Sequence, residues 1–196
     1  DWLERIAKAH AEPFPAIGGS IGNVEPSSDV GWAAYFTEFS HWMPASEPRW
    51  VDDMAAANVS YKREVLEECG RFIEGTYCSD TEFHWRLGRS GHRLRFDPSI
   101  RVSHHGIADL GRFLRHEYRH GRAFGRIHIR GKRLSRWNRA AKAIGAPLCP
   151  ARMLATIIRN NLENRVYLRE FVTAFPLVVA GVISWSSGQV TSYAAE

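Results

Sequence analysis

The feature that most constrains this chain is residues 58–105, which alternate strand-like and helix-like segments. Residues 62–68 have the apolar spacing of a short amphipathic helix. Residues 93–96 and 100–104 have strand patterns, and the Asp-Pro-Ser sequence between them is a turn signal. We therefore expect an α/β fold in which a hairpin follows the helices.

The sharpest local signal in this stretch is the acidic sequence Ser79-Asp80-Thr81-Glu82. Its spacing is that of a capping box, in which the Ser79 hydroxyl accepts from the N–H of Glu82 and the Glu82 carboxylate reaches back. Asp80 would then lie in the first turn of a helix that ends at Gly91. The carboxylate of Asp80 either takes part in chemistry or only complements the helix dipole.

The N-terminal residues carry patterns of ordinary globular structure. Residues 2–11 have one apolar helical face, and residues 16–22 form a short buried strand whose glycines admit close backbone approach. A helical aromatic stripe, with three- and four-residue spacing, consists of Trp32, Tyr35, Phe36 and Phe39. Such a stripe is more typical of a core than of a ligand-stacking surface, although Trp32 and Trp42 stay candidates for stacking on a ligand.

Composition excludes several classes of protein. With 196 residues, 44% hydrophobic and 24% charged, the chain is long enough for a sizeable core and argues against disorder. Its cysteines, Cys69, Cys78 and Cys149, lack a metal-ligand spacing and favour a reducing compartment. The chain begins without Met and without a basic-then-apolar leader, so we expect a piece of something longer.

Positive charge is concentrated in residues 112–142, which contain eleven Lys or Arg and one acid, Glu117. Five arginines would form one helical stripe: Arg112, Arg115, Arg119, Arg122 and Arg126. The stripe could bind phosphates, since Arg makes bidentate contacts to them. It could also face an anionic membrane, or be only a solvated basic face.

The C-terminal residues are mostly apolar. Residues 153–168 have an amphipathic helical pattern, and the 15 uncharged residues 171–185 fall short of the roughly 20 that a spanning helix needs. We expect a membrane-associated or re-entrant helix, with Trp185 and Tyr193 as interface anchors. The alternative is a buried helix that packs on the basic one. The basic residues on the N-terminal side of this segment would lie on the cytoplasmic face of the membrane.

The order of motifs in residues 1–125 resembles the C-terminal half of family 2 glycosyltransferases. A small-residue segment that ends in Asn58 precedes an Arg-rich helix, and Gly70-Arg71-Phe72 leads to the acidic turn. The sequence Arg86-Leu87, then Gly91-His92-Arg93-Leu94, then Pro98, Val102 and His104 follows in the family's order. Two positions depart from the family pattern. Ser79 replaces its usual Glu, and Ala56 or Ala57 replaces its Gly.

The resemblance implies roles for individual residues. Asp80 stands where the family places its general base, which takes a proton from the acceptor hydroxyl. His104 stands where a third ligand of the divalent metal often lies. Adjacent strand residues point to opposite faces, so His104 and His105 do not both face one metal. Arg119 and Arg122 would meet the donor diphosphate, and the acceptor side would include Asn58, Glu82 and Trp85.

The implied fold is a partial GT-A, Rossmann-like domain that lacks its N-terminal nucleotide-binding half and is followed by C-terminal helices. Its parts would be residues 1–110 (catalytic), 111–145 (basic helical) and 146–196 (membrane-associated). The implied activity is inverting transfer from a nucleotide-sugar to a glycolipid or cell-envelope polysaccharide. It would need Mn²⁺ or Mg²⁺ held by an upstream Asp-x-Asp motif.

A second hypothesis comes from another class of protein. In it, the chain is a non-catalytic basic module whose stripe from Arg112 to Arg126 binds nucleic acid or anionic membrane lipid, as a pI near 9.4 permits. The sequence contains no recognised nucleic-acid-binding motif, so we expect membrane lipid rather than nucleic acid as a partner.

Overall fold

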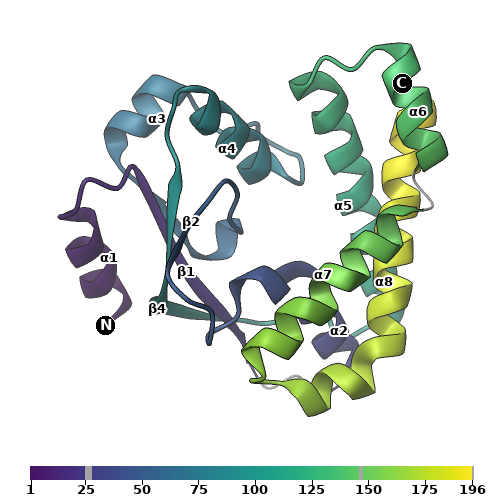
Figure 1. Ribbon diagram of the computed structural model, residues 1–196, viewed down its shortest axis with the longest axis horizontal. Helices are drawn as coiled ribbons and strands as arrows, with labels where there is room; N and C mark the ends of the chain where they lie inside the picture. Colours follow the sequence, from purple (N-terminus) through teal and green to yellow (C-terminus); the bar gives the residue numbers. More distant parts are fainter. Residues whose placement is uncertain (25–27, 146–147, 196) are drawn as a thin grey trace. The chain divides into compact units, whose positions relative to one another are not determined.

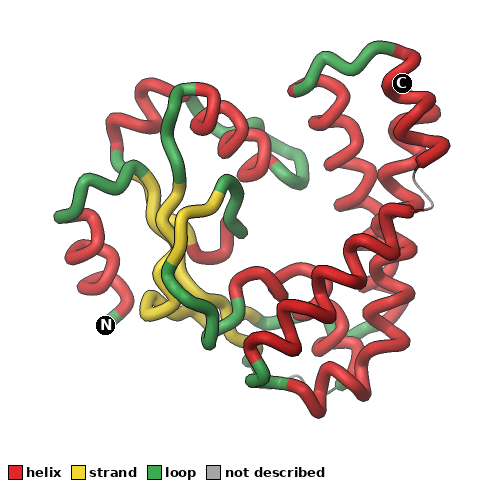
Figure 2. Tube along the Cα trace, viewed as in Figure 1, coloured by secondary structure: helices red, strands yellow, loops and turns green. Residues whose placement is uncertain are grey.

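The computed structural model describes residues 1–24, 28–145 and 148–195. These form two compact units (Figures 1 and 2). Unit 1 comprises Asp1–Val24, Trp42–Gly75 and Ser79–His104, and unit 2 comprises Glu25–His41, Thr76–Cys78 and His105–Glu196, apart from the residues not described. The fold is α/β, as predicted.

Unit 1 is built on a mixed four-stranded sheet with the order β2-β4-β1-β3. The central strands β1 (Ala16–Asn23) and β4 (Leu94–His104) are parallel. The short edge strands β2 (Arg49–Val51) and β3 (Val59–Tyr61) run antiparallel to their neighbours. Parallel neighbouring strands need a crossover connection. The helices that lie between β1 and β4 in the sequence belong to this connection.

The predicted hairpin in residues 93–104 is wrong, because these residues form one strand. The pairing of β4 with β1 shifts between Gly19, opposite Asp97, and Ser20, opposite Arg101, so the Asp-Pro-Ser sequence bulges out of the ladder instead of reversing the chain. The Ser20 hydroxyl donates to the Pro98 carbonyl at 2.8 Å and holds the bulge. A Cβ on Gly19 would lie 1.7 Å from the Ile100 carbonyl oxygen, so the bulge requires glycine there.

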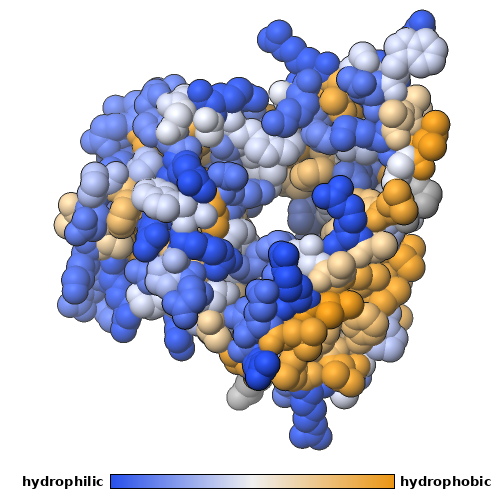
Figure 3. Space-filling view, viewed as in Figure 1, coloured by the Kyte–Doolittle hydropathy of each residue, from blue (hydrophilic) through white to orange (hydrophobic). Residues whose placement is uncertain are grey.

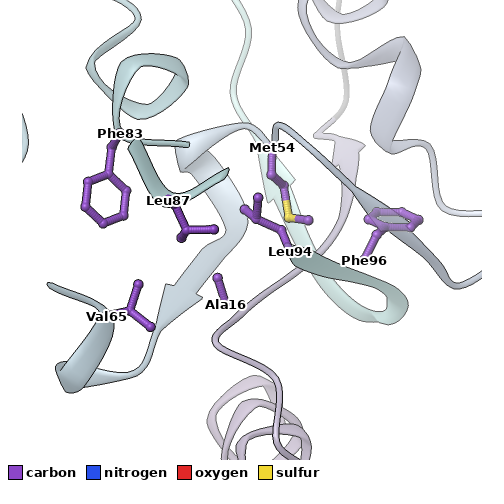
Figure 4. Close-up of a cluster of buried hydrophobic side chains, with 7 residues drawn as sticks. All are labelled: Ala16, Met54, Val65, Phe83, Leu87, Leu94 and Phe96. Carbon is purple, nitrogen blue, oxygen red and sulfur yellow. The ribbon is translucent and has the colours of Figure 1, made fainter. Parts of the chain in front are cut away.

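Three α-helices and a 3₁₀ turn complete unit 1. They are α1 (Trp2–His10), the turn Ala56–Asn58, α3 (Arg63–Cys69) and α4 (Ser79–Arg89). Helix α3 confirms the helix predicted at residues 62–68, and it ends at Gly70, which has φ +79°. Helices α3 and α4 contribute Val65, Phe83 and Leu87 to a buried apolar cluster (Figure 4). The cluster also contains Ala16, Met54, Leu94 and Phe96.

The predicted capping box at the start of α4 is wrong, although the predicted end of this helix is confirmed. Ser79 is itself helical, and the Glu82 carboxylate pairs with Arg86 four residues on, with Nε to Oε2 at 2.9 Å. The i,i+4 arginine is a stronger partner for Glu82 than a backbone N–H. At the other end, Gly91 has φ +84°, and the His92 N–H donates to the Leu87 carbonyl, which is a Schellman motif.

Unit 2 is helical. Its helices are α2 (Asp29–Phe39), α5 (Leu110–Gly131), α6 (Arg136–Gly145), α7 (Cys149–Asn164) and α8 (Leu168–Ala195), and a 3₁₀ turn, Ser40–Trp42, follows α2. The aromatic stripe of α2 lies in the core, as predicted, since Tyr35, Phe36 and Phe39 are buried. The ring of Phe36 packs edge-on against Phe171 of α8, with centroids 5.1 Å apart.

Small residues let α5 and α8 approach each other closely. A Cβ on Gly121 would lie 1.8 Å from the Trp185 carbonyl oxygen, and one on Gly188 would lie 2.0 Å from the Tyr118 carbonyl oxygen. The Ser184 hydroxyl donates to the Leu114 carbonyl at 2.8 Å, and the Ser192 hydroxyl donates to the Arg122 carbonyl at 2.7 Å. These contacts agree with the alternative expectation, in which the apolar C-terminal segment packs on the basic helix.

The sequence-based expectation that the apolar C-terminal segment is too short to span a membrane, at 15 residues, is wrong. Helix α8 is continuous over 28 residues and is long and apolar enough to cross a membrane, while 39% of its most apolar window is buried. Three of its serines donate to backbone carbonyls, namely Ser184 to Leu114, Ser187 to Ile183 and Ser192 to Arg122, and the helix continues through them. Length and composition alone do not distinguish a core helix from a membrane helix.

Candidate functional site

The N-terminus of α4 positions the acidic residue that the sequence singles out. The Asp80 carboxylate accepts from the N–H of Ala56 at 3.0 Å through Oδ2, and from the N–H of Thr81 at 2.9 Å through Oδ1. The chain enters the helix through Cys78, whose φ is +61°. Asp80 is therefore partly exposed, sits at the positive end of a helix and touches the small-residue segment at residues 55–57.

A second carboxylate, Asp53, lies beside the same helix and begins a hydrogen-bonded chain. His84 Nδ1 lies 2.6 Å from Asp53 Oδ1, and His84 Nε2 lies 2.6 Å from the Tyr61 hydroxyl oxygen. A carboxylate only accepts, so Nδ1 carries the proton and, in a neutral ring, Nε2 accepts from Tyr61. The Thr81 hydroxyl donates to the other oxygen of Asp53 at 3.0 Å. We call Asp53, His84 and Tyr61 the relay.

The relay is buried at its centre and open to solvent at Asp53. The side chain of His84 is fully buried, whereas that of Asp53 is 46% exposed. Burial raises the pKa of the Tyr61 hydroxyl, and the negative charges of Asp80 and Asp53 raise it further. Tyr61 therefore stays protonated and donates to His84 at physiological pH. The relay gives Asp53 a fixed position at the surface, close in sequence to the segment that contacts Asp80.

Sequence reasoning missed the relay, although two signals for it exist. Asp53 directly precedes the buried Met54 and the small-residue segment, and His84 lies between the apolar residues Phe83 and Leu87 on the inner face of a helix. A buried histidine needs polar partners. Which partners it finds depends on a strand and a loop more than twenty residues upstream, so the sequence does not name them.

The residues expected on the acceptor side have unequal surroundings. Asn58 is buried, and its amide donates to the carbonyls of Ser20 and Ile100 at 2.9 Å each while its oxygen accepts from Trp2 Nε1 at 3.1 Å. These contacts hold the bulge of β4 in place. Glu82 is engaged by Arg86, and Trp85 is partly exposed on α4.

The residue expected to bind metal, His104, ends β4 opposite Asn23. Its side chain is partly exposed, and its carbonyl accepts from the N–H of Val24 at 3.2 Å. His105 is exposed and begins the last segment of unit 2. Strand β4 therefore ends between the two histidines.

The expected diphosphate ligands lie on α5 in unit 2. Arg119 is exposed and Arg122 is partly exposed, and the stripe that contains them also includes the exposed residues Arg112, Arg115 and Arg126. The opposite face of α5 is buried and includes Phe113, Gly121 and Ile127. The predicted single stripe on a helix is confirmed.

Unit 2 contains two further features with chemical potential. One is a group of three possible metal ligands, Glu38, His116 and Glu117. The other is a cavity of about 630 Å³ between α5, α6, α7 and α8. Its lining mixes cationic side chains, such as Lys142 and Arg152, with apolar ones, such as Leu148 and Ile157.

Comparison with protein-family models, curated proteins and solved structures gave no match to this chain.

Proposed function

We propose that this chain is the acceptor-side part of an inverting glycosyltransferase that resembles family 2 and has a GT-A fold. The observation that carries the proposal is the contact of the Asp80 carboxylate with the Ala56 N–H at 3.0 Å. It joins the acidic turn to the small-residue segment that ends in Asn58, two pieces that the resemblance assigns to one site. The mixed sheet with a central parallel pair is compatible with half of such a domain.

In this proposal, Asp80 takes the proton of an acceptor hydroxyl as that oxygen attacks the anomeric carbon of a nucleotide-sugar. The bond to the diphosphate breaks, and the configuration at the anomeric carbon inverts. Asp53 lies at the open end of the relay, with its position fixed by His84 and Thr81. It is suited to accept hydrogen bonds from other hydroxyls of a sugar acceptor.

The metal and the donor need residues in addition to these. An accessible imidazole at His104 suits a divalent ion, but one imidazole does not make a metal site. In the proposal, carboxylates of an Asp-x-Asp motif would supply the remaining ligands, and a bound ion would supply positive charge for the diphosphate. On α5, Arg119 and Arg122 are proposed as ligands for the donor diphosphate, since guanidinium groups match phosphate geometry.

We also propose that unit 2 associates with the cytoplasmic face of a membrane. Apolar side chains gather on the surface over α7 and α8 (Figure 3). On α6, Trp137 is 73% exposed and Ile144 is 80% exposed. Basic side chains flank them at Lys132, Arg133, Arg136, Arg139 and Lys142, and residues 118–162 contain no acidic residue. Exposed apolar and basic groups on one helix are typical of binding to anionic lipid.

The test measures release of nucleoside diphosphate by the full-length gene product that contains this chain, with a panel of nucleotide-sugars, membrane extract and Mn²⁺ or Mg²⁺. We expect release with one donor, and a loss of about 10²–10⁴-fold in Asp80→Asn, the range for removal of a general base. Asp52→Asn is the matched control because Asp52 is 91% exposed and pairs only loosely with Arg93, at 3.5 Å. Equal turnover in Asp80→Asn and the control would remove Asp80 from the mechanism.

The non-catalytic module remains the second candidate, and the exposed apolar residues of α6 favour its lipid form. If no donor is turned over with either metal, binding assays separate its two forms. Binding to anionic vesicles without binding to nucleic acid would support the lipid form. Affinity for duplex or single-stranded nucleic acid that falls steeply with salt would support the other.

A further inference from the structure

Helices α2 and α5 of unit 2 bring two acids and a histidine together. Glu38 lies near the end of α2, and His116 and Glu117 are neighbours in the second turn of α5. The Glu38 Oε1 lies 2.9 Å from His116 Nε2. One ligand atom from each of the three residues lies within 4.8 Å of the others. Two carboxylates and an imidazole from two helices therefore converge on one point.

Glu117 is the unusual member of this group. Its residue is 0% exposed, and neither carboxylate oxygen has a hydrogen-bond partner among the described residues. Burial raises the pKa of Glu117 well above its ordinary value, and the charge of Glu38 raises it further. An unpartnered buried carboxyl is costly whether ionised or neutral, because even the protonated form leaves polar atoms unsatisfied.

We propose that Glu38, His116 and Glu117 bind a divalent transition-metal ion, with Zn²⁺ as the best fit. A cation would supply both the missing partner of Glu117 and the opposite charge for two neighbouring acids. One imidazole and two carboxylates are ligands that Zn²⁺ accepts, in sites with three protein ligands and one open position.

The surroundings leave room for that open position. The side chains of His116 and Glu38 are 23% and 19% exposed, so an ion reaches the site from the surface while Glu117 holds it from the interior. The other edge of the His116 ring packs near Tyr77, with centroids 5.2 Å apart, which restricts the ring's rotation. The ligand set is thus largely preorganised.

A metal here would link α2 to α5, because its ligands come from both helices. Since α2 precedes the sheet strand β4 in sequence and α5 follows it, the ion would fix two distant parts of the chain within unit 2. Its effect on stability is therefore measurable without any sugar-transfer assay. The site uses none of the residues assigned to sugar transfer. Its test is therefore independent of the test of the proposed function.

The experiment titrates metal-free protein with ZnCl₂ in a calorimeter and follows thermal unfolding with and without the ion. We expect one Zn²⁺ per chain and a higher melting temperature in its presence. Glu117→Gln keeps the shape of the side chain, and we expect it to weaken Zn²⁺ affinity at least tenfold. Glu38→Gln is a second variant at a more exposed ligand. The matched control is Glu163→Gln on α7, whose side chain is 67% exposed.

Substitution with Co²⁺ shows whether cysteine thiolates are among the ligands. Nitrogen and oxygen ligation gives no thiolate charge-transfer band, so its absence would exclude Cys69, Cys78 and Cys149 as the binding groups. Zn²⁺ binding lost in both variants and kept in the control supports the site. No stoichiometric binding, or equal binding by Glu117→Gln, overturns it and leaves Glu117 as a buried protonated acid.

Discussion

His84 Nδ1 lies 2.6 Å from Asp53 Oδ1, and this pair fixes one face of the site that Asp80 borders. The imidazole is fully buried and the carboxylate is 46% exposed. A buried ring that hydrogen bonds through both nitrogens has one orientation and one tautomer. The relay therefore turns a surface loop at Asp53 into a rigid part of unit 1.

Removal of the Tyr61 hydroxyl tests its hydrogen bond to the buried His84. Tyr61→Phe leaves His84 Nε2 without its donor, and an unsatisfied buried polar atom costs about 1–3 kcal/mol of unfolding free energy. Urea unfolding measures this change. The control Tyr77→Phe alters a residue that is 41% exposed, and we expect it to change stability by less than about 0.5 kcal/mol. Equal effects of the two substitutions would contradict the relay.

The close approach of α5 and α8 predicts that Gly121→Ala destabilises the protein. The added Cβ would overlap the Trp185 carbonyl oxygen, a backbone atom that cannot rotate away. Overpacking of this kind costs about 1–3 kcal/mol. On the same helix, a Cβ on Gly111 has no neighbour nearer than 3.5 Å, so Gly111→Ala should be neutral or stabilising. Thermal unfolding of the two variants gives the comparison, and a loss of stability in Gly111→Ala alone would contradict it.

The pH dependence of stability should include a contribution from His10. Partial burial lowers the pKa of His10 below its ordinary value of 6.5, and the positive charge of Lys62 lowers it further. The unfolded chain then binds this proton more tightly than the folded one, so the contribution is complete above about pH 6.5 and is lost as the pH falls through the lowered pKa. Unfolding of the wild type and His10→Gln between pH 5 and 8 measures the difference, which should shrink as the pH falls. A constant difference would contradict the prediction.

Membrane association predicts that α6 and the basic residues just before it govern binding to anionic vesicles. Basic residues near such a surface contribute about 1 kcal/mol each, so Lys132→Gln with Arg133→Gln should weaken binding by roughly 30-fold. Trp137→Ala should weaken it further, since Trp137 is 73% exposed. Lys8→Gln on α1 removes an exposed charge from unit 1 and should leave binding unchanged. Co-sedimentation with vesicles of anionic and neutral lipid distinguishes these cases.

The sequence by itself determined the elements whose signals are local. Glycine positions ended α3 and α4, because Gly70 and Gly91 take positive φ cheaply. Three- and four-residue spacing identified the aromatic face of α2 and the arginine stripe of α5. The acidic turn was placed correctly at the start of α4, although its capping was not.

Tertiary structure decided everything that depends on a distant partner. Residues 93–104 form one bulged strand, because Ser20 and Asn58 hold the carbonyls of Pro98 and Ile100. Hydroxyl groups of α8 donate to carbonyls of α5 or of its own preceding turn, so serines lie within this helix without ending it. The relay and the Glu38–His116–Glu117 group join residues more than twenty positions apart. Such contacts depend on how elements pack, which no local pattern of residues records.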